Sequence, residues 1–127
     1  MEQYLIDTNV VSDYLSAALP ASSTKFMDEV IDAIPTLSIV SQIELLCWQT
    51  HAETETKVLA FLNDCRILNI DPQVVAMCVQ IRKGKRVKMP DAIIAATAVS
   101  SNLILLTNNE KDFQQITGLR FINPWKV

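Results

Sequence analysis

The chain has 127 residues, a length that predicts a single domain over residues 1–127 with one hydrophobic core. Half of the residues are apolar, which excludes an intrinsically disordered chain, and no apolar run reaches the roughly 18 residues that a membrane span needs. The net charge of −3 argues against a general attraction to nucleic acids. The first residues have neither the basic nor the apolar part of a secretory signal, so we expect a cytoplasmic protein.

The cysteines and the histidine limit the chemistry that the chain offers. Cys47, Cys65 and Cys78 lie in apolar stretches, and no two of them have the Cys-x-x-Cys spacing, so we expect reduced thiols in the core. His51 is the only histidine. A catalytic Cys–His pair or a Ser–His–Asp triad is therefore disfavoured.

Short apolar runs alternate with helical hydrophobic patterns along the chain. In its first half the patterns predict a strand at 4–6, a helix at 10–15, a loop at 20–23, a helix at 26–34, a strand at 37–40, a helix that begins at Ser41 and a polar break at 50–56. In its second half they predict a helix at 58–62, a strand at 67–70, helices at 71–81 and 91–99, a strand at 103–106, a helix at 109–116 and a strand at 119–122. This alternation predicts an α/β fold with three layers, in which helices cover both faces of a mainly parallel sheet. Right-handed crossovers then place the carboxyl ends of the strands at one edge.

Four acidic residues stand where a predicted strand ends or where the next helix begins: Asp7, Glu44, Asp91 and Asp112. Because ligands of open α/β sheets bind at the carboxyl ends of the strands, we expect these side chains to converge. Two carboxylates about 4 Å apart repel by roughly 4 kcal/mol at an effective dielectric constant near 20, so such a cluster must take up protons or bind a cation. Oxygen ligands without Cys or His favour Mg²⁺ or Mn²⁺ over zinc.

Each of these acidic residues also has a purely structural explanation. Asp7 can cap the helix that follows it. Ser41 and Glu44 fit the capping-box pattern, and Asp91 can complement the dipole of its helix. Asp112 can be a solvated helix residue. These explanations treat each residue separately and leave open why acids, rather than Ser or Thr, recur at the strand ends.

A basic run lies just before the third of these acids and contains five of the eleven basic residues of the chain. Its members are Arg82, Lys83, Lys85, Arg86 and Lys88. Such a run predicts a contact surface for the phosphate backbone of a nucleic acid. A solvated basic loop is the alternative.

Four segments resemble the sequence blocks of PIN domains in their order and approximate spacing. They are LIDTN at 5–9, IELL at 43–46, PDAIIAA at 90–96 and LTNNEKDF at 106–113. The resemblance extends over residues 4–125, and the small single-domain form resembles the VapC toxins of toxin–antitoxin pairs. It implies a Rossmann-like sheet of strand order 3-2-1-4-5, an acidic Mg²⁺ or Mn²⁺ site, endoribonuclease activity on RNA, silencing by a cognate antitoxin, and a homodimer.

The resemblance also implies roles for individual positions. Asp7, Glu44 and Asp91 match the three central metal-site acids. Either Asn109 or Asp112 completes the site, because family members place the fourth acid at one or the other position. The residues that match the polar lining of the pocket are Thr8, Asn9, Thr107, Asn108 and Asn109.

If this site forms, Mg²⁺ held by Asp7 and Asp91, with Glu44 bound directly or through water, is expected to activate a water for attack on an RNA phosphodiester. A second ion near Asp112 would stabilise the leaving oxygen. Cys47 and Trp48 depart from the family pattern, because many members have an aromatic residue and a glycine at these positions.

Two other functions stay open at this stage. The segment 7–11 resembles the first motif of haloacid-dehalogenase-like phosphatases, which use an aspartate nucleophile, but Asn9 stands where that motif has its second acid. The other alternative is an inactive PIN-like module that binds RNA or a protein. A glycine-rich nucleotide-binding loop is disfavoured, because Gly84 and Gly118 are the only glycines and neither follows a strand in the required context.

Overall fold

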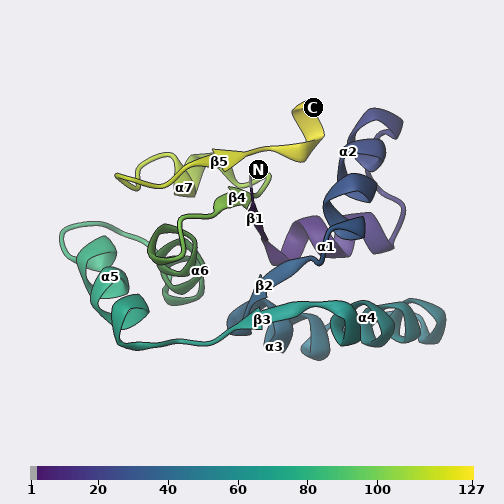
Figure 1. Ribbon diagram of the computed structural model, residues 1–127, viewed down its shortest axis with the longest axis horizontal. Coiled ribbons are helices and arrows are strands. Elements are labelled where there is room, and N and C mark those ends of the chain that lie inside the picture. Colours follow the sequence, from purple (N-terminus) through teal and green to yellow (C-terminus); the bar gives the residue numbers. More distant parts are fainter. Residues whose placement is uncertain (1–2) are drawn as a thin grey trace.

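The computed structural model describes residues 3–127, along which strands and helices alternate as the sequence predicts (Figure 1). The strands are β1 (Tyr4–Ile6), β2 (Thr36–Ser38), β3 (Arg66–Leu68), β4 (Ile104–Leu106) and β5 (Phe121–Ile122). The helices are α1 (Thr8–Leu15), α2 (Ala21–Asp32), α3 (Ile39–Cys47), α4 (Ala52–Asp64), α5 (Pro72–Arg82), α6 (Met89–Ser100), α7 (Glu110–Phe113) and the 3₁₀ helix η1 (Pro124–Lys126). Within these described residues, no helix has the length and apolar character needed to cross a membrane.

The strands pair in parallel. β1 pairs with β4, β4 pairs with β5, and β2 pairs with β3. β1 and β2 lie side by side, although no ladder pair links them within residues 3–127. The predicted α/β fold with a parallel sheet is therefore confirmed, whereas the complete strand order 3-2-1-4-5 stays a prediction.

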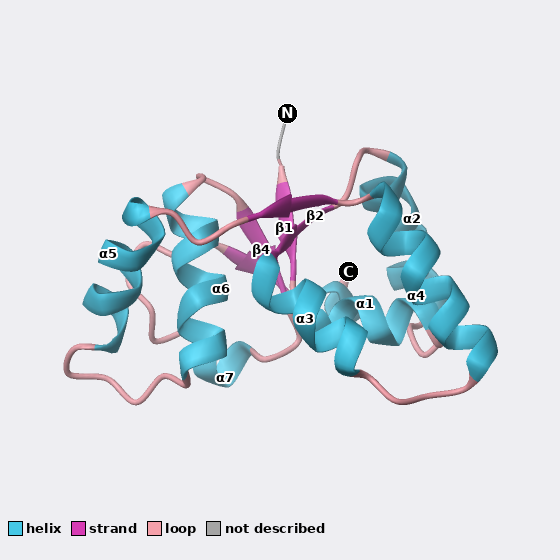
Figure 2. Cartoon of the chain, turned by 90° about the horizontal axis from the view of Figure 1, so that it is seen from below, coloured by secondary structure: helices cyan, strands magenta, loops and turns pink. Residues whose placement is uncertain are grey.

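Two hydrophobic cores lie on opposite faces of the sheet, because successive residues of a strand point to opposite sides. In β1, Leu5 belongs to one core and Ile6 to the other, and in β4 Leu105 and Leu106 divide in the same way. Helices α5, α6 and α7 cover the first face, and α1, α2 and α4 cover the second (Figure 2). The expected three-layer arrangement is thus present.

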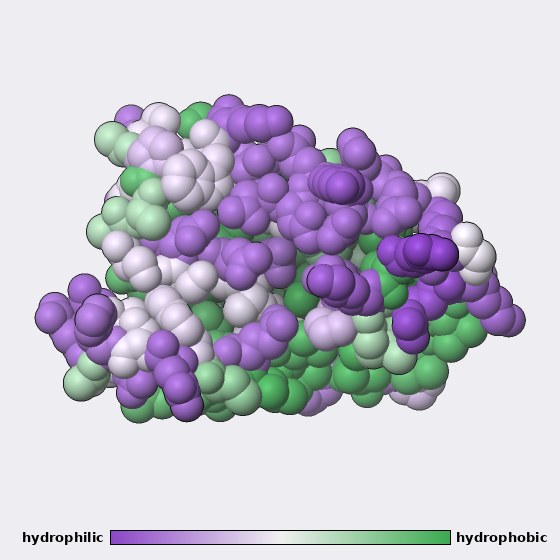
Figure 3. Space-filling view, turned by 180° about the vertical axis from the view of Figure 1, so that it is seen from behind, coloured by the Kyte–Doolittle hydropathy of each residue, from purple (hydrophilic) through white to green (hydrophobic). Residues whose placement is uncertain are grey.

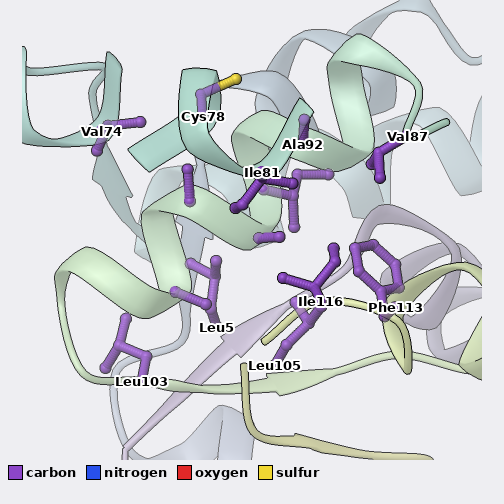
Figure 4. Close-up of a cluster of buried hydrophobic side chains, with 14 residues drawn as sticks. Leu5, Val74, Cys78, Ile81, Val87, Ala92, Leu103, Leu105, Phe113 and Ile116 are labelled. Atoms are coloured by element: carbon purple, nitrogen blue, oxygen red, sulfur yellow. The ribbon is translucent and has the colours of Figure 1, made fainter. Parts of the chain in front are cut away.

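The alanines of α6 allow this helix to pack closely between the sheet and α5. Those that are fully buried are Ala92, Ala95, Ala96 and Ala98. Ile81 of α5 lies on one side of α6, and Leu5 and Leu105 of the sheet lie on the other (Figure 4). Because α6 runs back towards the start of β4, its first turn lies at the carboxyl edge of the sheet, and this turn carries Asp91.

Several predicted boundaries of helices and strands are wrong. Two helices begin in polar segments that have no apolar periodicity and were therefore predicted as non-helical. α2 starts at Ala21, directly after Pro20, so residues 21–23 are helical rather than a loop. Residues 52–56 likewise form the start of α4, where Glu53 and Glu55 complement the helix dipole. α7, β3 and β5 are shorter than predicted, and η1 was not predicted.

The cysteines occupy different environments. Cys78 is buried and Cys65 is partly buried, but Cys47 is exposed, and all three are free thiols. The prediction of a core thiol is therefore wrong for Cys47, which lies at the last, solvent-facing turn of α3.

Candidate functional site

Asp7 ends β1 and is the most buried of the four acidic residues, with 5% of its surface exposed. Its Oδ1 accepts a hydrogen bond from the backbone N–H of Thr8 at 2.9 Å, which makes it the N-cap of α1. Its Oδ2 accepts a hydrogen bond from the hydroxyl of Thr107 at 2.8 Å. Because β1 and β4 are paired, the ends of these strands bring together two residues that lie 100 positions apart.

The pKa of Asp7 reflects this environment. Burial raises the pKa from its ordinary value of 3.8 to about 6. The hydrogen bonds from Thr107 and Thr8 lower it, and the carboxylates of Asp91 and Glu44 raise it. Among the described residues that influence this pKa, none is basic. Asp7 therefore lies in the field of other carboxylates, and no basic residue of the described part of the chain offsets it.

Glu44 lies inside α3 and does not close a capping box. The N-cap of α3 is Ser38, whose hydroxyl accepts a hydrogen bond from the backbone N–H of Val40 at 3.1 Å. Ile39 and Val40 form the first turn of the helix rather than the end of a strand, and Ser41 lies one turn before Glu44. The structural explanation of Glu44 as the partner of a Ser41 cap is therefore wrong.

The hydroxyl of Thr8 connects α1 to Glu44. Thr8 Oγ1 lies 2.6 Å from Glu44 Oε1 and 2.9 Å from Ser41 Oγ. A hydroxyl has one proton, so Thr8 donates to the carboxylate and accepts from Ser41. The sequence pattern did not predict this role of Ser41, which is fully buried. The spacing of three residues between Ser41 and Glu44 on one helix face was the available signal.

Asp91 occupies the first turn of α6 and is half-buried. Burial raises its pKa, the carboxylates of Asp112 and Glu44 raise it further, and Lys88 lowers it. The cap of α6 is Lys88, which makes no side-chain hydrogen bond to the helix start. A carboxylate that only complements the helix dipole does not need two further acids nearby, and their negative charges disfavour the ionised form of Asp91.

Asn109 and Asp112 act together at the start of α7. Asn109 is the N-cap, and its Oδ1 accepts from the backbone N–H of Asp112 at 3.4 Å. Asn109 Nδ2 also donates to Asp112 Oδ2 at 3.0 Å, which holds that carboxylate in place. The backbone N–H of Asn109 donates to the hydroxyl of Thr107 at 3.0 Å and so links this corner to Asp7.

The four acidic residues therefore share one electrostatic field. Asp91 and Glu44 act on Asp7, and Asp112 and Glu44 act on Asp91. Within residues 3–127, no three His, Cys, Asp or Glu side chains lie close enough to hold a metal ion in their present positions. The chemistry of the donor set nevertheless fits a hard divalent cation, because the donors are carboxylate oxygens that repel one another.

A groove of about 470 Å³ opens beside Glu44, between α1 and α3. It is lined by Thr8, Asn9, Ser12, Glu44, Leu45, Cys47 and Trp48. A cavity of about 640 Å³ lies at the opposite edge of the sheet, near the starts of β1, β2 and β3, and none of the predicted site residues lines it. The groove, and not the larger cavity, is therefore the one that adjoins the site, through Glu44 alone among the four acids.

Two predicted residues of the pocket lie on different sides of the acids. Asn9 lines the groove. Asn108 is exposed, and its Nδ2 lies 3.5 Å from Asp13 Oδ2, which also accepts a hydrogen bond from the indole of Trp125 at 3.3 Å. Asn108 therefore contacts α1 and the C-terminal segment, a connection that the sequence pattern did not reveal.

The basic run forms an exposed loop between α5 and α6. Val87 is buried and anchors the loop, and the Nε of Arg82 donates to its carbonyl oxygen at 3.1 Å. Lys85 Nζ donates to the carbonyl oxygen of Gln115 at 2.8 Å. Since Lys88 ends this loop and lowers the pKa of Asp91, the basic loop leads directly to the acidic residues.

A parallel α/β fold with acidic residues at its strand ends agrees with the sequence comparison. The PIN domain model matches residues 4–119, and the chain belongs to the PIN domain family. The predicted resemblance to this family is confirmed. A comparison with curated protein sequences gave no match.

Solved structures of similar fold come from VapBC, FitAcB and other toxin–antitoxin assemblies. A chain of DNA-bound VapBC from Salmonella typhimurium has a TM-score of 0.80 and 23% identity, over 98% of this chain and 99% of that chain. A chain of FitAcB from Neisseria gonorrhoeae has a TM-score of 0.78 and 25% identity, over 98% and 100%. A chain of a toxin–antitoxin complex from Klebsiella pneumoniae has a TM-score of 0.75 and 29% identity, again over 98% and 100%. The likeness to VapC-type PIN domains is thus confirmed at the level of fold.

Proposed function

We propose that this chain is an endoribonuclease that depends on Mg²⁺ or Mn²⁺ and serves as the toxin of a toxin–antitoxin pair. The observation that carries the proposal is the electrostatic effect of Asp91 and Glu44 on the buried carboxylate of Asp7, whose pKa no basic residue of the described chain lowers. Membership of the PIN family and the similarity to toxin–antitoxin structures at 25% and 29% identity support it.

We assign Asp7 and Asp91 as direct ligands of the divalent ion, with Glu44 bound directly or through water. When bound by these acids, the ion would supply the positive charge that they lack and would lower the pKa of a water for attack on the phosphodiester. Asp112, which acts electrostatically on Asp91, is the residue that we assign to a second ion. Hard carboxylate ligands of this kind suit Mg²⁺ and Mn²⁺.

Hydrogen bonds hold three of the four acids, Asp7, Glu44 and Asp112, before any ion binds. Thr107 and the backbone of Thr8 fix the two oxygens of Asp7, and the Thr8 hydroxyl fixes one oxygen of Glu44. Asn109 fixes one oxygen of Asp112. Such preorganisation reduces the rearrangement needed when substrate binds.

The basic loop is the surface that we propose for the RNA backbone. Its cationic side chains are exposed and can each contact a phosphate. Lys88 places the end of the loop beside Asp91. An RNA strand bound along the loop is thus directed towards the acids despite the net charge of −3.

We also propose two protein partners, a cognate antitoxin and a second copy of the chain. An acidic site is complementary to an arginine side chain, which an antitoxin can insert to block it. Apolar side chains gather along the lower edge of the molecule, on the side where Figure 1 places α3, whereas the rest of this face is mostly hydrophilic (Figure 3). The exposed apolar residues of α3 and α5 include Ile43, Leu46, Val75 and Val79, and we assign them to a homodimer interface.

A cytoplasmic location is part of the same proposal. The RNA substrate is found there, and the three free cysteines fit a reducing compartment.

One alternative is an inactive module that binds RNA or a protein. It is favoured by the absence, within residues 3–127, of three acids arranged closely enough to hold an ion, and by Asn109 at a position where some family members have an acid. This alternative predicts no metal-dependent cleavage. A phosphatase with Asp7 as nucleophile is less favoured, because Asn9 stands where the phosphatase motif has its second acid.

The test is cleavage of transfer and ribosomal RNA by the purified chain, freed of antitoxin, with Mg²⁺ and with a chelator. We expect cleavage only with the metal. Asp7→Asn should abolish it while the fold is kept, because an asparagine can still cap α1. Retained cleavage by this variant would remove Asp7 from the mechanism.

The matched control is Asp71→Asn. Asp71 is also the N-cap of a helix, α5, and its Oδ1 accepts a hydrogen bond from the backbone N–H of Val74 at 2.8 Å. This variant changes the same chemical group outside the acidic cluster, so it should cleave RNA like the wild type. Equal loss of activity in both variants would point to a loss of fold rather than of metal ligands.

A further inference from the structure

We propose that the groove between α1 and α3 binds a nucleobase of the RNA and that Trp48 provides the surface on which the base stacks. This inference rests on the proposed ribonuclease function and adds to it a subsite for the nucleoside next to the reacting phosphate. The sequence pattern did not predict that Trp48 contacts a base.

The location of the groove makes it part of the path of a bound RNA strand. Thr8 and Glu44 line the groove, and the same two side chains are joined by a hydrogen bond of 2.6 Å at the edge of the acidic cluster. Thr8 also donates its backbone N–H to the carboxylate of Asp7 at 2.9 Å, so the groove begins at the residue next to Asp7. We therefore place the nucleoside that neighbours a phosphate at Asp7 in this groove. The negative charge of Glu44 disfavours a phosphate inside the groove itself, which leaves the base as the part that enters.

The lining matches the chemistry of a nucleobase, which has apolar faces and polar edges. Leu45 is 2% exposed and forms an apolar floor. Trp48 provides an aromatic surface, and the side chains of Asn9 and Ser12 provide polar groups at the rim. The volume of about 470 Å³ lies in the range of small-molecule sites and is ample for one base.

The end of α3 explains why Trp48 is available at this place. Trp48 is the C-cap of the helix, with an extended backbone (φ −70°, ψ 117°), so its side chain leaves the helical path after Cys47. It is partly buried and packs against the core on the α1 side of the sheet. A side chain held in this way loses little conformational entropy when a base stacks on it.

The first experiment uses the fluorescence of Trp48. The chain has two tryptophans, so Trp125→Phe leaves Trp48 as the only one, and Trp48→Phe leaves Trp125 as the matched control. A short RNA is added in the presence of a chelator, so that no cleavage occurs. We expect RNA to quench the fluorescence of the Trp125→Phe protein and not that of the Trp48→Phe protein. An abasic ribose–phosphate chain of the same length should have no such effect.

The second experiment measures cleavage with Mg²⁺. Trp48→Ala should lower kcat/KM by about 5- to 150-fold, mainly through a higher KM, because stacking on an aromatic side chain is lost. Trp48→Phe keeps a ring and should recover most of this loss. A groove residue with only a packing role would instead change the thermal stability and leave KM unaltered.

The outcomes separate this inference from the proposed function. Quenching that is absent, or that the abasic chain produces equally well, overturns the base subsite even if the protein cleaves RNA. Quenching by RNA in a protein that never cleaves supports the subsite and overturns the nuclease proposal instead. A response of Trp48 to the cognate antitoxin but not to RNA would assign the groove to a protein partner and contradict the inference.

Discussion

Asp7 and Asp71 each cap a helix through a side-chain oxygen, but their environments differ. This difference gives the proposed site its chemistry. Asp71 caps α5 and is exposed, so its charge is solvated. Asp7 is buried, and its charge is opposed by those of Asp91 and Glu44. A helix cap needs only one oxygen acceptor. Burying the negative charge of Asp7 therefore costs free energy that capping alone does not explain.

We expect the stability of the metal-free protein to fall as the pH rises from about 4 to about 7. The pKa of Asp7 rises from 3.8, its ordinary value, to about 6 in the folded protein. Between these values the folded state binds a proton that the unfolded state has released, so a rise in pH favours unfolding. The difference of about 2 pKa units corresponds to roughly 3 kcal/mol. Urea unfolding in the presence of a chelator, at several pH values, measures it.

The comparison variant is Asp7→Asn, which keeps the cap and removes the titrating group. It should be more stable than the wild type at pH 7, and the difference should disappear near pH 4. Mg²⁺ should stabilise the wild type at pH 7 more than the variant, because it supplies the counter-charge. If the free energy of unfolding changed with pH in the same way for both proteins, the buried carboxylate of Asp7 would not destabilise the fold at pH 7.

At the residue scale, the sequence predicted some of the local contacts of the acids and not others. The cap role of Asp7 follows from its position before a helical pattern, and the structure contains it. The predicted helix start was Ser41, but the N-cap of α3 is Ser38, because the strand ends at Ser38 rather than at Val40. A run of apolar residues fits a buried strand and a buried helix turn equally well.

At the scale of elements, the loop between α5 and α6 connects the predicted basic run to the acidic cluster. Gly84, with a φ of +76°, turns the chain after α5, and the buried Val87 fixes the return. Arg82 and Lys85 are tied to backbone carbonyl oxygens, whereas no hydrogen bond is recorded for the side chains of Lys83 and Arg86 among the described residues. These two residues are therefore the ones to test as phosphate contacts.

We expect the double variant Lys83→Gln/Arg86→Gln to bind RNA more weakly and with a smaller dependence on salt. Each lost contact with a single-stranded phosphate lowers the slope of log K against log salt by about 0.7. Fluorescence anisotropy of a labelled RNA over a series of salt concentrations measures the slope. The charge-matched control, Lys25→Gln/Lys57→Gln, changes exposed residues of α2 and α4. If both double variants had the same slope of log K against log salt, the basic run would be a solvated loop and not a phosphate-binding surface.

The elements themselves were predictable where the hydrophobic pattern was long and regular. α5 and α6 were predicted within about two residues at each end, because Pro72 and Pro90 mark their starts and the apolar spacing is helical. The polar start of α4 was missed, because Glu53 and Glu55 contribute to a helix through its dipole and not through an apolar pattern.

At the scale of the molecule, α3 and α5 each expose large apolar side chains to solvent. Leu46 is 54% exposed and Val79 is 47% exposed. Contiguous exposed apolar surface is uncommon on a monomer and is typical of an interface. This is the basis on which we expect a second copy of the chain to cover this face.

We expect the wild type to sediment with the mass of two chains of 14.2 kDa, and Leu46→Glu or Val79→Glu to sediment as a monomer. A charge placed in an apolar interface loses its hydration without a partner, which opposes association. Ile34→Glu is the control, because Ile34 is an exposed apolar residue at 73% that lies outside α3 and α5. A wild type with the mass of one chain would contradict the proposed homodimer.

The sequence by itself determined the alternation of strands and helices, the two-sided burial of the strands and the positions of the acids after them. These features depend on residue order and on short-range periodicity, which the chain carries locally. Only the tertiary structure decided which side chains meet. The contact between Thr107 and Asp7, the link from Ser41 to Thr8 and the groove beside Trp48 arise from strand pairing and helix packing between segments far apart in the chain. Such contacts depend on the whole set of packed elements, and no local pattern encodes them.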